Sequence, residues 1–227
     1  MTFSEKIKAY NRSLSLTLPL PEGIQSMNPY QYPSVLAVTD VFYDTYYMDN
    51  KSRRLIMGIN PGRFGAGVTG IPFTDSVRLR DDCHIHMKGI PETKELSSVF
   101  VYKMIERYGG AKAFYGDFYI NSVCPLGFIK MNEKGRGVNY NYYDSAELTA
   151  ILHDYIIQNI KTLLAMGFEN DRCYCLGTGQ NAQFLQKINA QNGFFKEIIA
   201  LEHPRFIMQY KSKLVDYYTN EYVKKLR

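Results

Sequence analysis

Polar residues and glycines that could bind or activate a substrate follow four short hydrophobic runs of this chain. Asn60–Pro61–Gly62 follows the first run, Asn121 lies in the second, Gly177–Thr178–Gly179 ends the third and His203–Pro204 ends the fourth. Amides and imidazoles donate and accept hydrogen bonds, and glycines let backbone amides approach a ligand closely. These residues are candidates for one site if the fold brings the four runs together.

The four runs are the strand candidates of the chain, because they are short and rich in β-branched and aliphatic residues. They are RRLIMGI (53–59), FYINSV (118–123), CYCLG (173–177) and EIIALEHP (197–204). Helical periodicity covers 98–108, which ends at Gly109–Gly110, and 144–166, which ends at Gly167.

The segment 144–166 is the clearest predicted helix. Asp144 and Glu147 have the spacing of a capping box, which predicts that the helix begins at Asp144. The apolar stripe predicted to lie on the sheet consists of Leu148, Ile151, Tyr155, Ile156, Ile160 and Leu163.

Strands that alternate with helices predict the α/β class. We expect a three-layer α/β/α sandwich around a mainly parallel four-stranded sheet, formed by a single domain over residues 1–227. Ligands of such sheets bind at the carboxyl ends of the strands. The polar residues described above follow those ends, so the fold class predicts that they meet at one rim.

The most informative segment is GINPGRFGAGVTGIPF (58–73), in which a strand enters a loop with glycines at 58, 62, 65, 67 and 70. It is not a Walker loop, because no Gly-Lys-Ser/Thr follows. It is a poor dinucleotide-binding motif as well, because the glycine spacing is wrong.

This segment resembles the first motif of the single-strand-selective monofunctional uracil-DNA glycosylases, with Asn-Pro-Gly, Phe-Gly and Thr-Gly-aliphatic-Pro-Phe in register. The resemblance continues in the family's order through about residues 53–210. It includes DSVRLRD (75–81), YINSVCPLGF (119–128), LGTGQNAQFL (176–185) and LEHPRF (201–206). Related mismatch-specific glycosylases share Gly-Ile-Asn-Pro-Gly but usually have Asn at the position of His203. The classical uracil glycosylases have Asp-Pro-Tyr where this chain has Asn60–Pro61–Gly62.

The resemblance implies hydrolysis of the bond between uracil and deoxyribose after the base is flipped out of the DNA stack. In that family's chemistry, His203 would donate a hydrogen bond to uracil O2 as charge develops there. Asn60 would orient the attacking water. Each residue also has a structural interpretation, since histidines cap strand ends and asparagines favour the turn before a proline.

Three further residues would bind the base by the same resemblance. Asn121 would contact the Watson–Crick edge of uracil, Phe73 would stack on the base, and Gly62 would let the backbone approach it. The structural alternatives are a buried asparagine bonded to backbone, a core phenylalanine and a turn glycine.

The chain departs from the family where a DNA-penetrating wedge is expected. The family has His-Pro-Ser-Pro-Arg-Asn, whereas this chain reads His203–Pro204–Arg205–Phe206–Ile207. Arg205 or Phe206 could fill the space left by the flipped base, and the missing Ser-Pro pair affects the expectation of activity on duplex DNA more than that on single strands. Arg63 replaces a family proline and would contact a phosphate or remain solvated.

Composition agrees with a DNA-binding enzyme without establishing one. The 227 residues carry a formal charge of +5 with a pI near 8.9, which suits a polyanionic partner if the cations share one face. The four cysteines fit reduced intracellular thiols, and MTFSEKIKAYNRS (1–13) shows no apolar core followed by a small-residue cleavage site, so we expect no export. We expect an intracellular monomer that binds single-stranded DNA or flipped uracil and no membrane.

No cofactor or metal is expected. Cys83–His84–Ile85–His86 contains metal-binding residue types, but on the helix expected there the two histidines would point in different directions. The preferred lesion stays open among uracil, hydroxymethyluracil and xanthine. Two other functions also remain open: a catalytically silent nucleic-acid-binding relative, and a nucleobase- or nucleotide-binding protein.

Overall fold

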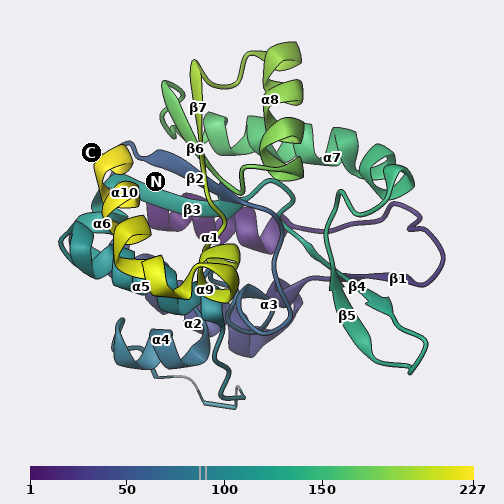
Figure 1. The fold of residues 1–227 in the computed structure, drawn as a ribbon, viewed down its shortest axis with the longest axis horizontal. Helices are drawn as coiled ribbons and strands as arrows, with labels where there is room; N and C mark the ends of the chain where they lie inside the picture. The colour runs from purple at the N-terminus through teal and green to yellow at the C-terminus, as the bar shows by residue number, and fades with distance from the viewer. Residues whose placement is uncertain (87, 90) are drawn as a thin grey trace.

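A four-stranded parallel sheet forms the centre of the molecule in the computed structural model, which describes residues 1–86, 88–89 and 91–227. Its strand order is β3-β2-β6-β7 (Figure 1). These strands are β2 (Arg54–Gly58), β3 (Phe118–Ser122), β6 (Arg172–Leu176) and β7 (Glu197–Leu201). All three pairings are parallel, so the predicted sheet is confirmed.

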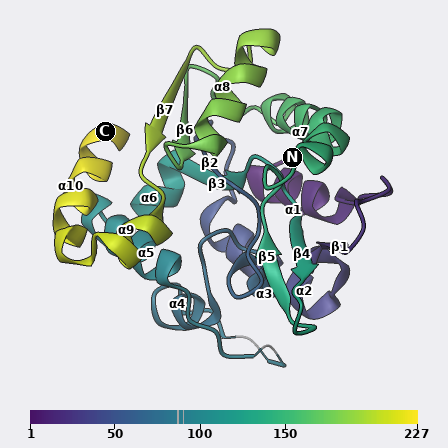
Figure 2. The same ribbon diagram turned by 45° about the vertical axis from the view of Figure 1, so that its right-hand side comes forward.

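Helices cover both faces of this sheet. On one face Tyr119 stacks on Phe168, which follows α7 (Ala146–Ala165), and contacts Tyr43 of α2 (Pro33–Tyr46). On the other face Phe118 packs against Phe114 of α6 (Ala111–Asp117). Figure 2 shows α5, α9 and α10 on one side of the sheet and α1, α2 and α7 on the other. The α/β/α sandwich is therefore confirmed.

The remaining helices complete these outer layers. They are α1 (Phe3–Ser13), α3 (Ala66–Thr69), α4 (Ser76–Asp81), α5 (Leu96–Tyr108), α8 (Gln180–Asn192), α9 (Pro204–Tyr210) and α10 (Val215–Leu226), with 3-10 turns η1 (Pro29–Gln31) and η2 (Ser212–Leu214). No helix in the described part of the chain is long and apolar enough to cross a membrane.

A second sheet was not predicted from the sequence. It has three antiparallel strands in the order β1-β4-β5, formed by β1 (Ile24–Met27), β4 (Gly127–Met131) and β5 (Gly137–Tyr140). It projects to the right of the parallel sheet in Figure 1. Most residues of β1 and β5 are partly or fully exposed, so these strands lack the hydrophobic runs that mark the central ones. Through Asn139 and Tyr140 this sheet reaches the site described below.

The long helix begins one residue later than predicted. Ser145, not Asp144, is the N-cap of α7, and its side chain accepts a hydrogen bond from the backbone of Leu148. Asp144 instead accepts hydrogen bonds from Asn141 in the preceding turn. The buried stripe also contains Leu152, whereas Ile151 and Tyr155 are only partly buried.

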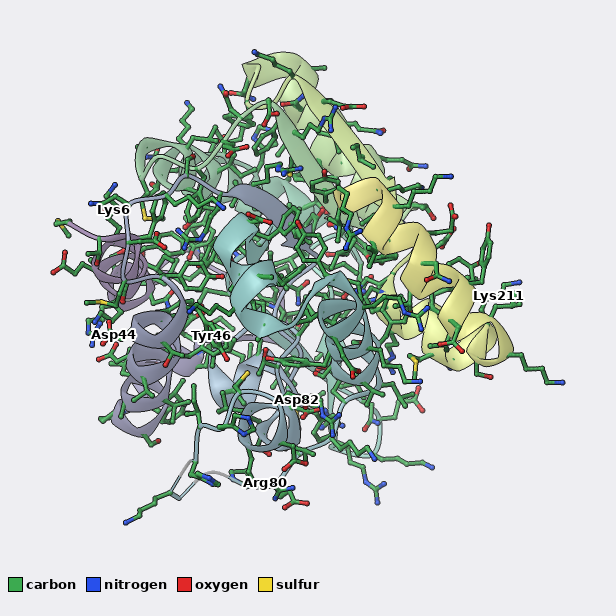
Figure 3. The ribbon with its side chains drawn as sticks, turned by 90° about the vertical axis from the view of Figure 1, so that its left-hand side faces the viewer. Lys6, Asp44, Tyr46, Arg80, Asp82 and Lys211 are labelled. Carbon is green, nitrogen blue, oxygen red and sulfur yellow. The ribbon has the colours of Figure 1, made fainter. Side chains whose placement is uncertain are left out.

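Two cations link segments that are adjacent in the fold but belong to different elements. Arg53 is fully buried, pairs with Asp49 and donates to the carbonyls of Tyr115, Lys51 and Tyr46. Lys6, labelled in Figure 3, donates to the carbonyl of Met166 at the end of α7.

The helix expected around Cys83–His86 is absent, because α4 ends at Asp81. His84 has a φ of 57°, a left-handed conformation that interrupts a helix. The described residues contain no group of three or more His, Cys, Asp or Glu placed to hold a metal ion. All four cysteines are buried and free.

Candidate active site

A pocket of about 390 Å³ opens at the carboxyl end of the parallel sheet. Asn60 and Gly62 reach it from the loop after β2, Phe73 from the loop after α3, and His203 from the end of β7. The structure thus brings together these four predicted catalytic and base-binding residues, and two predicted DNA-contacting residues, Arg205 and Phe206, line the same pocket. The other wall residues are Ile59, Pro61, Ala66, Pro72, Glu95, Ser97, Ser122, Asn139, Asn141, Tyr143, Arg205, Phe206, Gln209 and Tyr210.

The amide of Asn60 is held in one orientation by the segment before α7. Its Oδ1 accepts a hydrogen bond from the backbone of Tyr142 (3.1 Å), and its Nδ2 donates to the carbonyl of Tyr140 (3.3 Å). Tyr142 is fully buried, and its hydroxyl donates to Asn181 Oδ1. An amide oxygen has two lone pairs, so Oδ1 keeps one acceptor position for a further hydrogen bond.

The imidazole of His203 is fixed by the helix that follows it. His203 is the N-cap of α9, and its Nδ1 accepts a hydrogen bond from the backbone N–H of Arg205 (3.1 Å). Burial, assisted by the nearby Arg205 charge, lowers the pKa of His203 from its usual 6.5 to about 4. The ring is therefore neutral at pH 7. Since Nδ1 is an acceptor, the single proton lies on Nε2, which makes that atom a donor.

Phe73 has a strained backbone next to this histidine. Its φ of 53° lies in the left-handed region, where a residue other than glycine costs on the order of 1–2 kcal/mol. The ring lies 5.9 Å from the His203 ring, centroid to centroid. A Cβ added to Gly58 would come within 2.9 Å of Phe73 Cε2, so the ring can occupy this position because residue 58 has no side chain.

Gly62 faces two polar side chains across the pocket mouth. A Cβ added there would meet Asn139 Nδ2 and Glu95 Oε1, each at 3.4 Å. Burial, together with the Asp75 carboxylate, raises the pKa of Glu95 above its usual 4.5, and Arg205 opposes the shift. A larger residue at position 62 would crowd this mouth.

Asn121 is not brought to the pocket, which corrects its predicted position. It lies on the same face of β3 as Tyr119, which packs toward α2, because alternate residues of a strand share a face. Its Oδ1 accepts a hydrogen bond from the backbone of Ser122, and its Nδ2 is buried without a partner among the described residues. Ser122, on the opposite face, lines the pocket instead.

The three predicted DNA-contacting residues line the pocket or the groove next to it. Phe206 is 40% exposed and lines the pocket, and Arg205 lines both the pocket and an adjoining groove. Arg63 lines only that groove. Pro204 begins α9, so Arg205 and Phe206 lie in the first turn of a helix instead of on an extended wedge.

Comparison with known proteins identifies the family. A model of the uracil DNA glycosylase superfamily matches residues 45–227. The chain belongs to this superfamily. The fold is also similar to the crystal structure of wild-type SMUG2 from Pedobacter heparinus, with a TM-score of 0.96 and 51% sequence identity. That alignment covers 99% of this chain and 97% of the other. No curated protein matches.

These findings confirm the family and the class of activity predicted from the motifs. The protein is a DNA glycosylase of the uracil-excising superfamily, a hydrolase of N-glycosidic bonds that acts in base excision repair. Sequence reasoning missed Glu95, Ser122 and Asn139. Ser122 is next to the predicted Asn121 in sequence, but their side chains lie on opposite faces of β3, and the sequence does not show which face borders the pocket. Asn139 lies on a strand that the sequence did not predict.

Proposed function

We propose that the protein hydrolyses the N-glycosidic bond of uracil in single-stranded DNA, with Asn60 and His203 as its catalytic residues. The observation that carries this proposal is the pocket itself, where the neutral His203 ring, the Phe73 ring and the fixed Asn60 amide meet. A base that enters the pocket would contact an aromatic face, a neutral donor and a water-orienting acceptor.

His203 stabilises the leaving base in this scheme. As the bond between C1′ and uracil N1 breaks, its electron pair moves onto the base, and Nε2–H donates to O2. A neutral donor suits this task, because it adds a hydrogen bond where charge develops without binding DNA phosphate in its place.

Asn60 positions the water that completes the reaction. The free lone pair of Oδ1 accepts a hydrogen bond from that water, whose oxygen then bonds to C1′ while its proton passes to solvent. In this scheme water attacks C1′ directly, and no covalent intermediate forms. Uracil leaves as an anion and an abasic sugar remains.

Base recognition uses Phe73, Gly62 and Ser122. Phe73 stacks on the base, a contact worth about 1–3 kcal/mol in nucleic-acid sites. Gly62 keeps the mouth open for the base. Ser122 takes the base-edge role first expected of Asn121, because its hydroxyl both donates and accepts and it lines the pocket.

DNA outside the pocket contacts Arg63, Arg205 and Phe206. The two arginines neutralise phosphates, and the exposed Phe206 ring occupies the space that the flipped base leaves. Flipping costs least in single strands, and a helix turn replaces the family's wedge, so we propose a preference for single-stranded DNA. One chain supplies every residue of the proposed site, so a monomer suffices.

The test uses oligonucleotides that contain one uracil, in single-stranded and duplex form, followed by alkali to cleave abasic sites. We expect strand breaks from the wild type, and a rate lower by about 10²-fold or more for Asn60→Ala. Asn220→Ala, at an exposed asparagine of α10, is the matched control and should leave the rate unchanged. DNA binding without breaks would instead favour a silent relative, and the absence of both would favour a nucleobase-binding protein.

A further inference from the structure

A second groove of about 390 Å³ adjoins the active-site pocket. It is formed by the loop between β2 and α3, the start of α5, β5 and the start of α9. Figure 1 shows α3 between α9 and β5. Glu95, Ser97, Asn139 and Arg205 line both cavities, so the groove is continuous with the pocket.

The groove exposes hydrophobic side chains that would ordinarily be buried. Phe64 is 51% exposed, Leu96 50% and Val138 39%, and all three line it. Exposed apolar residues grouped in this way mark binding surfaces, whereas single ones carry no such meaning. The Arg63 guanidinium lies over one face of the Phe64 ring, so a stacking base would use the other face.

Three cations share the groove with these apolar residues. Arg63, Lys94 and Arg205 line the same groove, and the Arg63 guanidinium lies 4.3 Å from the centroid of the Phe64 ring. Glu95 is the one acidic residue among the described residues that line the groove, against three cations. A groove that holds an exposed aromatic ring and three cations fits a ligand with a π-face and a phosphate better than it fits an apolar peptide.

We propose that this groove binds a nucleotide adjacent to the target base in the same DNA strand. Its base stacks on Phe64, and its phosphate is neutralised by Arg63, Lys94 and Arg205. The inference rests on the proposed function, because it assumes that the strand's target base occupies the adjoining pocket. It predicts that the enzyme uses a neighbouring nucleotide on one side of the lesion as part of its substrate.

The experiment measures kcat/KM on a ladder of single-stranded oligonucleotides shortened one nucleotide at a time on either side of uracil. For the wild type, removal of one particular neighbour should lower kcat/KM by about 5- to 100-fold, the range expected for loss of one stacked base. Phe64→Ala should cause a similar loss on the full-length strand and no further loss on the shortened one. Phe64→Trp should restore the activity.

Tyr217→Ala is the control, since Tyr217 is similarly exposed (57%) and lies on α10 outside both cavities. Lys94→Gln should weaken binding and reduce the salt dependence of binding by about one phosphate contact. An equal loss for Phe64→Ala at every length, or no loss at any length, would overturn the proposal.

Binding of a uracil-free single strand separates this inference from the proposed function. If no uracil is excised but Phe64→Ala weakens that binding at least fivefold, the excision proposal fails, whereas the assignment of the groove as a nucleotide-binding surface is supported. If uracil is excised and Phe64→Ala changes neither binding nor kcat/KM, the groove proposal alone fails.

Discussion

Replacement of Arg205 by alanine should raise the pKa of His203 without removing the hydrogen bond that orients its ring. The bond comes from the backbone N–H of Arg205, so it survives truncation of the side chain. Burial is the larger cause of the lowered pKa and the Arg205 charge the smaller. The variant's His203 should therefore titrate between the wild-type value of about 4 and the usual 6.5.

The lowered pKa of His203 should make the folding stability depend on pH by a measurable amount. A pKa lowered from 6.5 to about 4 corresponds to a free-energy difference on the order of 3 kcal/mol between the neutral and protonated imidazole. Because the unfolded chain binds the extra proton first, the wild type should lose stability as pH falls from 6.5 towards 4. His203→Ala should lose correspondingly less over the same range, since it lacks this group.

Protonation also carries a catalytic consequence. A proton on Nδ1 would remove the acceptor that holds the Arg205 N–H, so the ring would lose its orientation below pH 4. The assay follows His203 by NMR from pH 3.5 to 8 and, in parallel, the single-turnover rate of uracil excision. The account predicts no His203 titration between pH 5.5 and 8 and a rate lower by about 10²–10³-fold for His203→Ala. A His203 pKa near 6.5 would refute the reasoning about its neutral tautomer.

Three further changes should separate structural from functional residues. Arg53→Met should lower the free energy of unfolding by about 3 kcal/mol or more in urea titrations, because three backbone carbonyls lose a buried donor. Glu95→Gln should tighten single-strand binding at pH 7 about fivefold by removing a charge that repels phosphate, as measured by fluorescence anisotropy. Ser122→Ala should lower kcat/KM about tenfold, whereas Asn121→Ala should change it less than threefold.

Each of these predictions has a matched comparison. Arg172→Met removes an exposed pair with Glu197 and should change stability by less than about 1 kcal/mol. Glu22→Gln removes an exposed acid outside both cavities and should leave DNA binding unchanged. Wild-type binding should tighten as pH falls through the raised pKa of Glu95, at a pH above 4.5. A larger loss of kcat/KM for Asn121→Ala than for Ser122→Ala would show that Asn121, not Ser122, contacts the edge of the base.

The central sheet and three residues at its rim could be predicted from the sequence, because both depend on local signals. Buried parallel strands are continuous apolar runs, and Asn60, Phe73 and His203 belong to motifs that can be read without knowing the fold. The strained backbone of Phe73 was not evident from its residue type, although the motif singled out this residue and the structure has its ring 5.9 Å from that of His203.

Three features could not be predicted from the sequence, because they depend on contacts between segments or on the direction in which a side chain faces. The second sheet pairs Ile24 with Lys130, and its exposed strands give no periodic signal. Asn121 and Ser122 are neighbours in sequence, so only the facing of β3 decides which of them lines the pocket. Asp144 and Ser145 both suit a helix cap, and the turn at Asn141 decides between them.

Product analysis under single-turnover conditions tests the central claim most directly. The wild-type protein is incubated with a uracil-containing single strand, and free uracil, abasic sites and borohydride-trapped protein–DNA adducts are quantified together. Hydrolysis by a water held at Asn60 predicts equal amounts of free uracil and abasic sites, with no trapped adduct. Absence of free uracil, or an adduct that accumulates with it, would contradict the account.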